Sequence, residues 1–399
     1  MQLTPASTSG SAVPSLHLAL AAAAAVLLAP AYAHAQSGAG PQTDTISSPL
    51  STARRSKADW QIDSAVLIYK EDGGRVTAVE PVLSLRRTDG NDRTLGLKLT
   101  YDSLTGASPN GAVPQPTAQT FTSPSGASSY TTPARAQPLD PFFKDSRVAL
   151  ALAWEQPAGE NQRISLGGNY SSEYDFTSFA LSTAFARDFN NKNTTVSAGL
   201  ALESNTINPV GGVATGLEPA FNFAGGRPNS DTRRVMDLLI GVTQVINRRW
   251  VMQWNLGIGR ANGYHSDSYK VLSVVDGTTG LLTGDQYVNE RRPDSRSRQT
   301  VYWQNKYHLA SDVIDASYRF YRDDWGLRAH TLDLRYCFQF SGGMHIEPQW
   351  RYYQQNAASF SRGWLVEGQD WISATNTARS MRWTGCSRCS CRMRNFHCW

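Results

Sequence analysis

The sequence is poor in charge and, through most of its length, in cysteine. Only 18% of its 399 residues are charged, and the formal net charge is +5. So small a positive excess does not provide the basic surface of a typical nucleic-acid-binding protein. Four of the five cysteines lie within the last fourteen residues, which leaves Cys337 as the single thiol in the body of the chain. We therefore predict no disulfide framework there.

Long apolar runs are also absent beyond the N-terminal region. No later stretch approaches the roughly 20 apolar residues that a membrane-spanning helix requires. A chain that crosses a membrane without such helices must do so as a closed β-barrel, because every backbone polar group needs a partner in lipid. The 11 tryptophans, 16 tyrosines and 32 glycines favour strands and turns over packed helices.

The N-terminal 35 residues have the features of a secretory signal peptide. An apolar run at 16–30 precedes small residues at Ala31, Ala33 and Ala35, and we expect cleavage after Ala35. No lysine or arginine precedes the run, which a misassigned start codon would explain. A buried N-terminal helix is the alternative, disfavoured by the short run and by Pro30. Residues 36–59 would then form a periplasmic segment.

From Gln61 onward, apolar residues recur with a period of two in segments of about ten residues. This is the length and pattern of transmembrane β-strands, with one apolar face and one polar face. Leu95, Leu97 and Leu99, for example, alternate with Gly96 and Lys98. We expect thirteen strands near 61–70, 76–87, 94–102, 146–156, 162–171, 176–188, 194–204, 234–246, 250–260, 299–309, 313–322, 327–340 and 345–353.

The lengths of the connections indicate a barrel. Short polar connections follow the even-numbered strands, whereas the long ones, near 103–145, 205–233 and 261–298, follow odd-numbered strands. With the N-terminus in the periplasm, this places short turns in the periplasm and long loops outside the cell. We therefore predict an all-β fold, an antiparallel transmembrane β-barrel of about 14–16 strands over residues 60–379, located in the cell outer membrane. Tryptophan and tyrosine near strand ends, such as Trp60 and Trp250, would form aromatic girdles.

The last twenty residues differ in character from the rest. Residues 380–399 show no alternation and are crowded with cysteine and arginine. We interpret them as an aberrant tail produced by a frameshift, and we expect the barrel to lack its closing strand. Cys386, Cys389 and Cys391 have a spacing similar to metal or redox sites, but their place in this tail favours a translation artefact.

Several segments resemble a known family. They include LTYDSLTGASPNGA at 99–112, DLLIGVTQVINRR at 237–249 and YRFYRDDWG at 318–326. Shorter matching segments lie at 120–126, 269–276 and 292–296. Over residues 60–370 the chain is similar to DUF3570, a bacterial family of predicted outer-membrane barrels without an established activity. The resemblance implies the same architecture. Genes of the family often lie near genes for flavin-transfer and thioredoxin-like proteins, which implies a role in redox or metal chemistry of the cell envelope.

Charged residues of both signs fall on the polar faces of the expected strands. Isolated charges in a barrel interior are costly, so we expect ion-pair networks between neighbouring strands. A selective pore lining is the alternative, although no ring of one sign is visible. The predicted inward-facing residues are Lys98, Asp102, Arg147, Glu155, Arg187, Glu203, Asp237, Lys306, Asp315, Arg319, Asp333, Arg335, Glu347 and Arg351.

Catalytic, cofactor and metal sites are not indicated, so we predict that the protein is not an enzyme and binds no cofactor. A hydrolase needs a nucleophile, a base and an orienting acid in one place. The histidines His265, His308, His330 and His345 are dispersed, and we find no serine or aspartate at a telling spacing from them. Two aspartates at 323–324 could bind calcium, but a hairpin turn is the better interpretation.

These patterns favour a channel or envelope scaffold with long extracellular loops. One alternative is a barrel enzyme or a component that handles metals or redox cofactors, and another is a soluble periplasmic all-β binding protein. Expected partners are outer-membrane lipids and lipopolysaccharide, the barrel-assembly machinery, and periplasmic redox or flavin-transfer proteins. The basic stretch 291–298 lacks interleaved aromatics and suggests contact with anionic lipopolysaccharide rather than nucleic acid.

Overall fold

The computed structural model describes residues 59–71, 76–122, 128–220, 226–340, 344–375 and 380–393. The expected signal peptide, nearly all of the 36–59 segment and the end of the tail lie outside these residues. The described part of the chain contains strands and no helix. In that part, accordingly, no helix is long and apolar enough to cross a membrane.

Fourteen strands form one antiparallel sheet in which neighbours in space are also neighbours in the chain, apart from short strands in the long connections. The strands in order are β1 (Asp59–Lys70), β2 (Val76–Thr88), β3 (Thr94–Pro109), β6 (Leu139–Gly159), β7 (Gln162–Ser172), β8 (Phe176–Phe189), β9 (Thr194–Ile207), β10 (Asp231–Asn247), β11 (Trp250–Gly263), β14 (Ser295–His308), β15 (Val313–Asp323), β16 (Arg328–Gln339), β17 (Met344–Gln355) and β19 (Met381–Met393).

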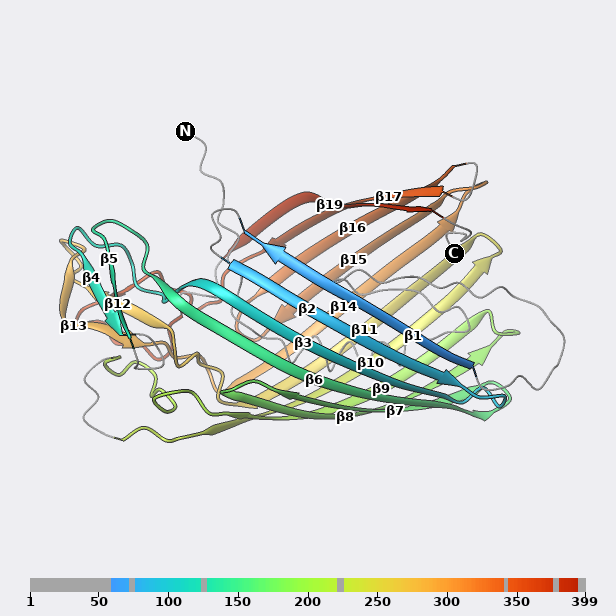
Figure 1. The fold of residues 1–399 in the computed structure, drawn as a ribbon, viewed down its shortest axis with the longest axis horizontal. Coiled ribbons are helices and arrows are strands. Elements are labelled where there is room, and N and C mark those ends of the chain that lie inside the picture. Colours follow the sequence, from blue (N-terminus) through green and yellow to red (C-terminus); the bar gives the residue numbers. More distant parts are fainter. Residues whose placement is uncertain are drawn as a thin grey trace.

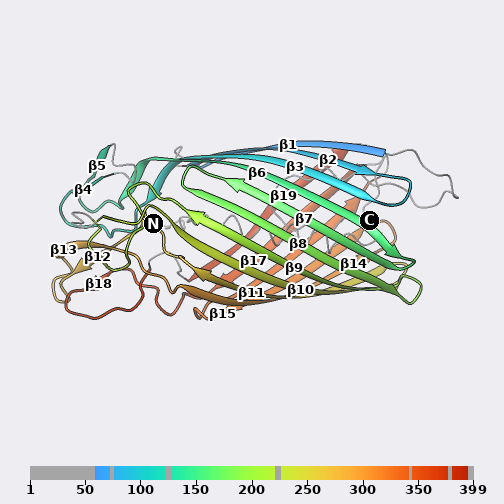
Figure 2. The same cartoon turned by 90° about the horizontal axis from the view of Figure 1, so that it is seen from below.

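The sheet curls around so that its strands run obliquely along an elongated barrel (Figures 1 and 2). The predicted all-β antiparallel barrel is confirmed, with a strand number inside the expected range. β1 and β19 form its two edges, and no backbone pairing joins them among the described residues, so the barrel is not closed.

The strand β19 corrects the expectation that no strand follows residue 380. Its residues pair with β17 from Met344↔Met393 to Gln355↔Met381. Backbone groups supply these hydrogen bonds, so an extended segment can pair without alternating side chains. The frameshift interpretation stays a prediction. Cys337, expected as a lone thiol, is disulfide-bonded in the structure.

The exposure of the two faces is the reverse of that in a water-soluble sheet. Leu181 on β8 and Leu202 on β9 are paired across the strands and are 55% and 51% exposed. Their neighbours Ala180 and Glu203, also paired, are 6% and 5% exposed. The outer face therefore presents apolar side chains, and the inner face holds small, polar and charged ones.

The long connections all follow odd-numbered strands of the sheet and lie together at one end, on the left in Figure 1. They comprise 110–138, 208–230, 264–294 and a fourth, 356–380, that the sequence pattern did not predict. We call the described residues of these connections the loop cap. They include the hairpin β4 (Gln119–Thr122) and β5 (Ser129–Thr132), and a sheet of β12 (Val271–Val275), β13 (Leu282–Asn289) and β18 (Leu365–Val366).

The loop cap has hydrophobic cores of its own. One joins Phe121 of the first connection to Val271 and Tyr287 of the third. Another joins Leu272 of the third connection to Leu365 of the fourth. Because these cores combine segments far apart in the sequence, the loops form a packed layer over one end of the barrel.

Candidate functional site: the inner face and the loop cap

The inner face holds nearly all of the charges predicted to lie there. The strand register and the alternation of exposure place every one of the fourteen in the inward row except Arg187. Neighbouring strands bring several of them together. Lys98, Lys306 and Glu347 make no ion pair with a described residue.

Arg187 is the correction. It shares the exposed row of β8 with Phe185 and Phe189, and its guanidinium carbon lies 5.1 Å from the centre of the Phe189 ring. The inward residue is its neighbour Asp188, which accepts a 3.1 Å bond from Arg163. The physical reason is that aromatic residues occur in both rows of β8, so the pairing with β7 and β9 decides that Arg187 faces outward.

Asp333 on β16 is the centre of the densest inner network. It accepts bonds from Arg351 Nε at 2.7 Å, from Gln349 Nε2 at 2.7 Å and from Arg335 Nε at 3.3 Å. Asp315, on the adjacent strand, accepts a 2.7 Å bond from Gln304. Acids on β15 and β16 are thus held by donors on the same or flanking strands.

Other inward charges form smaller local contacts. Arg147 donates to Asp102 from Nε at 2.6 Å. Ser165 donates to Glu155 at 3.1 Å, and Asn205 donates to Glu203 at 2.7 Å. The Arg319 guanidinium carbon lies 5.5 Å from the centre of the Tyr302 ring. These short-range partners give the inner face balanced charge rather than a ring of one sign.

The most buried ion pair joins Asp237 on β10 to Arg298 on β14. Arg298 Nη2 donates to both carboxylate oxygens, at 2.6 and 2.8 Å, and both side chains are 6% exposed. Gly259 on β11 lies between them, and a Cβ there would come within 2.2 Å of the Asp237 carboxylate. Sequence reasoning missed Arg298 because it assigned residue 298 to a loop, although the residue continues the alternation of the following strand.

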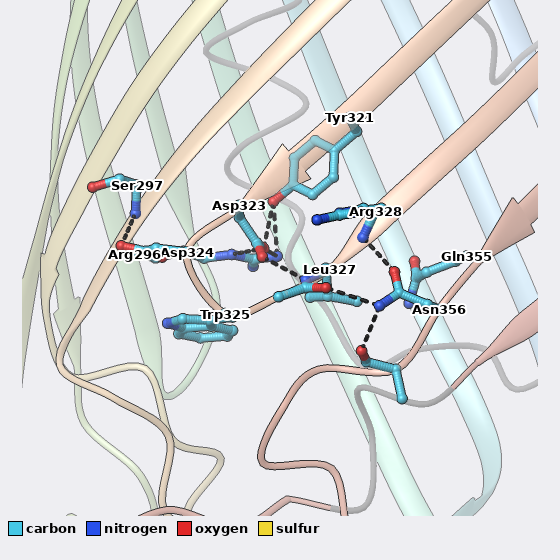
Figure 3. A network of polar contacts seen from close by, with 12 residues as sticks. Arg296, Ser297, Tyr321, Asp323, Asp324, Trp325, Leu327, Arg328, Gln355 and Asn356 are labelled. Atoms are coloured by element: carbon cyan, nitrogen blue, oxygen red, sulfur yellow. Dashed lines mark hydrogen bonds and ion pairs between the residues drawn. The ribbon is translucent and has the colours of Figure 1, made fainter.

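The hairpin between β15 and β16 holds the two aspartates considered for calcium (Figure 3). Asp323 accepts bonds from Arg296, from the Tyr321 hydroxyl at 2.9 Å and from the Leu327 amide at 2.9 Å. Asp324 accepts the Ser297 amide at 2.9 Å. Protein donors occupy both carboxylates, and the hairpin prediction is confirmed.

The basic stretch 291–298 is not a free cationic loop. Arg292 pairs with Glu290, Arg296 pairs with Asp323, and Arg298 pairs with Asp237. Arg296 also lies over the Trp325 ring at 4.4 Å. Acids within the protein therefore neutralise three of the four arginines of this stretch, and the expected contact with lipopolysaccharide stays a prediction.

Glu290 joins two connections of the loop cap. Its side chain is 1% exposed and accepts bonds from the Asp267 amide at 2.7 Å and from the Thr375 hydroxyl at 2.6 Å. It also pairs with Arg292 at 2.8 Å. The carboxylate thus ties the connection 264–294 to the connection 356–380. Burial raises the pKa of Glu290.

His265 lies where β11 passes into the loop cap. Its Nδ1 contacts the Gly263 carbonyl at 2.6 Å, and its ring packs edge-on against Trp325. Gly263 has a φ of 114°, and a Cβ there would come within 2.1 Å of the Thr232 carbonyl, so glycine is required at this bend. Burial lowers the pKa of His265 to about 4, and the nearby guanidinium groups of Arg233 and Arg296 act in the same direction.

We expect the loop cap to lose stability as the pH falls from about 6.5 to about 4. The unfolded imidazole binds a proton near pH 6.5, whereas the folded one stays neutral until about pH 4. The stabilisation is therefore complete above pH 6.5 and decreases by up to about 3 kcal/mol over this interval. Limited proteolysis of the loop cap at neutral and at acidic pH measures this loss of stability. His265→Phe keeps a ring beside Trp325 but cannot titrate, so an equal acid sensitivity in this variant would contradict the prediction.

The other histidines stay apart. His330 lies on the outer face and contacts the Tyr318 hydroxyl at 2.7 Å. His308 and His345 lie on the inner face near the short turns. Within the residues that the structure describes, no three His, Cys, Asp or Glu side chains converge as metal ligands.

A family comparison agrees with the sequence segments and the architecture. The family model described as "Protein of unknown function (DUF3570)" matches residues 17–380. The chain belongs to the DUF3570 family. The resemblance predicted from the sequence is therefore confirmed. No curated protein matches this DUF3570 chain.

Solved structures similar to this DUF3570 protein include an import receptor, a porin and an outer-membrane channel, all at low sequence identity. The ferric-catecholate import receptor Fiu of E. coli is 11% identical, with a TM-score of 0.38, over 75% of this chain. The chain spans 56% of that receptor. The anion-selective porin of Comamonas acidovorans is 11% identical, with a TM-score of 0.37, over 76% of this chain and 91% of the porin. The channel DcaP of Acinetobacter baumannii is 9% identical, with a TM-score of 0.35, over 75% and 92% of the two chains.

Proposed function

We propose that this DUF3570 protein is an outer-membrane β-barrel that serves as a channel covered at its extracellular end by the loop cap. The supporting observation is the reversal of exposure, with large apolar side chains outside and charged ones inside. In water, an exposed apolar face of this extent would drive association or aggregation. In lipid it is the stable arrangement, because apolar side chains face acyl chains and strand pairing satisfies the backbone.

The outer face carries the kinds of side chain that a bilayer would select. Exposed aliphatic residues such as Leu181, Leu202 and Leu256 lie within the strands. Some exposed aromatic residues, such as Trp60 and Phe189, lie at the ends nearest the short turns, whereas others, such as Trp254, lie within the strands. Aromatic rings at both interfaces are typical of membrane barrels. The long connections lie at the opposite end, which supports an extracellular loop cap.

Cell fractionation tests the location. We expect the mature protein in the outer-membrane fraction and resistant to extraction by carbonate or urea washes. Recovery in the soluble periplasm would contradict the proposal and favour the periplasmic all-β alternative.

A polar inner face with paired charges supports an aqueous passage of weak ion selectivity. We expect the purified protein in planar bilayers to conduct ions intermittently, because the packed loop cap covers one end. Glu290→Ala removes the link between two connections and the Glu290–Arg292 ion pair, so we expect openings that last longer by several-fold. The matched control is Glu367→Ala, which changes an exposed glutamate of the same cap.

A steady absence of current from both the wild type and Glu290→Ala would contradict the channel. An envelope scaffold would then be the better function. Equal effects of Glu290→Ala and Glu367→Ala would contradict the role of Glu290 in holding the cap closed.

A further inference from the structure

Four arginines on the outer face lie near the strand ends that lead into the loop cap. They stand in the exposed rows of four strands, two on either side of β14 in the sheet. We call them the rim arginines: Arg234 on β10, Arg260 on β11, Arg322 on β15 and Arg328 on β16. Below them, towards the middle of the barrel, the same rows carry exposed apolar residues such as Ile240, Ile258 and Leu332.

The strand register brings the rim arginines together in pairs. Arg322 and Arg328 are directly opposite each other on β15 and β16. Arg234 pairs with Asn262, and Met236 with Arg260, so Arg234 and Arg260 are diagonal neighbours. Strands lie about 4.8 Å apart, so the whole group extends on the order of 20 Å along the rim. Like charges directly opposite in a sheet are destabilising unless something neutralises them.

No acid among the residues that the structure describes neutralises this group. Arg322 donates to the Gln299 side chain at 2.8 Å and Arg260 contacts Asn262 at 3.4 Å, and both acceptors are uncharged amides. Among the described residues, none of the rim arginines makes an ion pair. Asp324 is the nearby acid at the hairpin tip, and its carboxylate accepts the Ser297 amide.

On the inner face and in the loop cap, by contrast, arginines form ion pairs with acids of the protein. Every arginine that forms an ion pair within the described part of the chain is inward-facing or lies in the cap, as Arg147, Arg292 and Arg298 do. The barrel therefore neutralises its internal guanidinium groups with its own carboxylates. None of the described carboxylates pairs with the external guanidinium groups at this rim, so their charge can be balanced by a molecule outside the barrel.

We propose that the rim arginines bind the phosphate groups of the phosphorylated glycolipid that forms the outer leaflet. The inference rests on the proposed outer-membrane location. Guanidinium groups bind phosphate through paired, charge-assisted hydrogen bonds. At the upper border of the apolar band they stand at the level of lipid headgroups, where a phosphate can lie between Arg322 and Arg328. The occupant is a lipid rather than free phosphate, because the apolar surface below the arginines accepts the acyl chains.

The experiment measures lipid binding by the full chain folded in uncharged detergent micelles. The probe is bisphosphorylated lipid A, and dephosphorylated lipid A and inorganic pyrophosphate are the comparison ligands. The test variant carries Arg234→Gln, Arg260→Gln, Arg322→Gln and Arg328→Gln. The matched control carries Arg87→Gln, Arg187→Gln, Arg248→Gln and Arg249→Gln, which remove four positive charges at the opposite end.

We expect the wild type and the control to bind bisphosphorylated lipid A, with affinity that decreases as salt is added. The test variant should lose at least about tenfold in affinity, since one basic side chain near an anionic surface changes binding on the order of fivefold. Dephosphorylated lipid A should bind weakly to every variant. Pyrophosphate at equal concentration should not displace the lipid.

Equal affinity of the test variant and the control, or equal binding of the dephosphorylated lipid, would overturn the proposal. Displacement by pyrophosphate would also overturn it, because the site would then be one for free phosphate. Insertion of the same preparation into lipid vesicles distinguishes a failure of the proposed rim site from a failure of the proposed membrane location. Insertion without lipid A preference contradicts the rim site alone, whereas a failure to insert contradicts the membrane location and the rim site together.

Discussion

Leu181→Arg should destabilise the folded barrel in lipid by about 2–4 kcal/mol, because it places a charge on the outer face near the middle of the membrane. Leu181 is 55% exposed and lies in the interior of β8. In a water-soluble sheet the same substitution of an exposed leucine would change the free energy of unfolding by about 0.5 kcal/mol or less. The variant therefore distinguishes lipid from water around this face.

The matched control is Phe189→Arg, on the same face and at the last residue of the same strand. There the expected cost is about 0–1 kcal/mol, because an arginine near the membrane interface can reach water. Arg187 already occupies the outer row at this end of β8. The measurement is reversible unfolding by urea in lipid vesicles. Equal effects at positions 181 and 189 would show that the face does not lie in a bilayer.

Asp237→Ala should destabilise the barrel by about 3–5 kcal/mol, because it leaves the guanidinium of Arg298 buried without its partner. The pair is bidentate and packs against Gly259, and both side chains are 6% exposed, so water has little access to it. The double variant Asp237→Ala with Arg298→Ala should recover part of the loss, since no unpaired charge remains. Denaturant unfolding of the single and double variants measures the coupling free energy between Asp237 and Arg298.

Lys98→Gln is the control for this pair, because Lys98 is an exposed inward residue without an ion pair among the described residues. We expect it to change the free energy of unfolding by about 0.5 kcal/mol or less. If Asp237→Ala were equally mild, the Asp237–Arg298 pair would contribute nothing specific, and the inner face would be fully hydrated at that level.

The rows of inward and outward residues were largely predictable because alternation is a local property of a strand. Lys98, Asp237 and Asp333 all stand where the period of two places them. The prediction failed at Arg187, where aromatic residues occur in both rows of the strand: Phe185 is outward and Phe176 shares the inward row. In such a segment only the pairing with β7 and β9 decides which row faces inward.

The local sequence determined the positions of thirteen strands and the parity of their connections, because side chains of an extended chain alternate between two faces whatever lies beside them. Tertiary structure alone decided the rest. The partner of Asp237 is 61 residues away, and the loop cap combines four connections through contacts that have no periodic signal. β19 pairs through its backbone despite lacking alternation. Contacts between distant segments depend on which strands become neighbours, and that becomes defined only when the whole sheet curls.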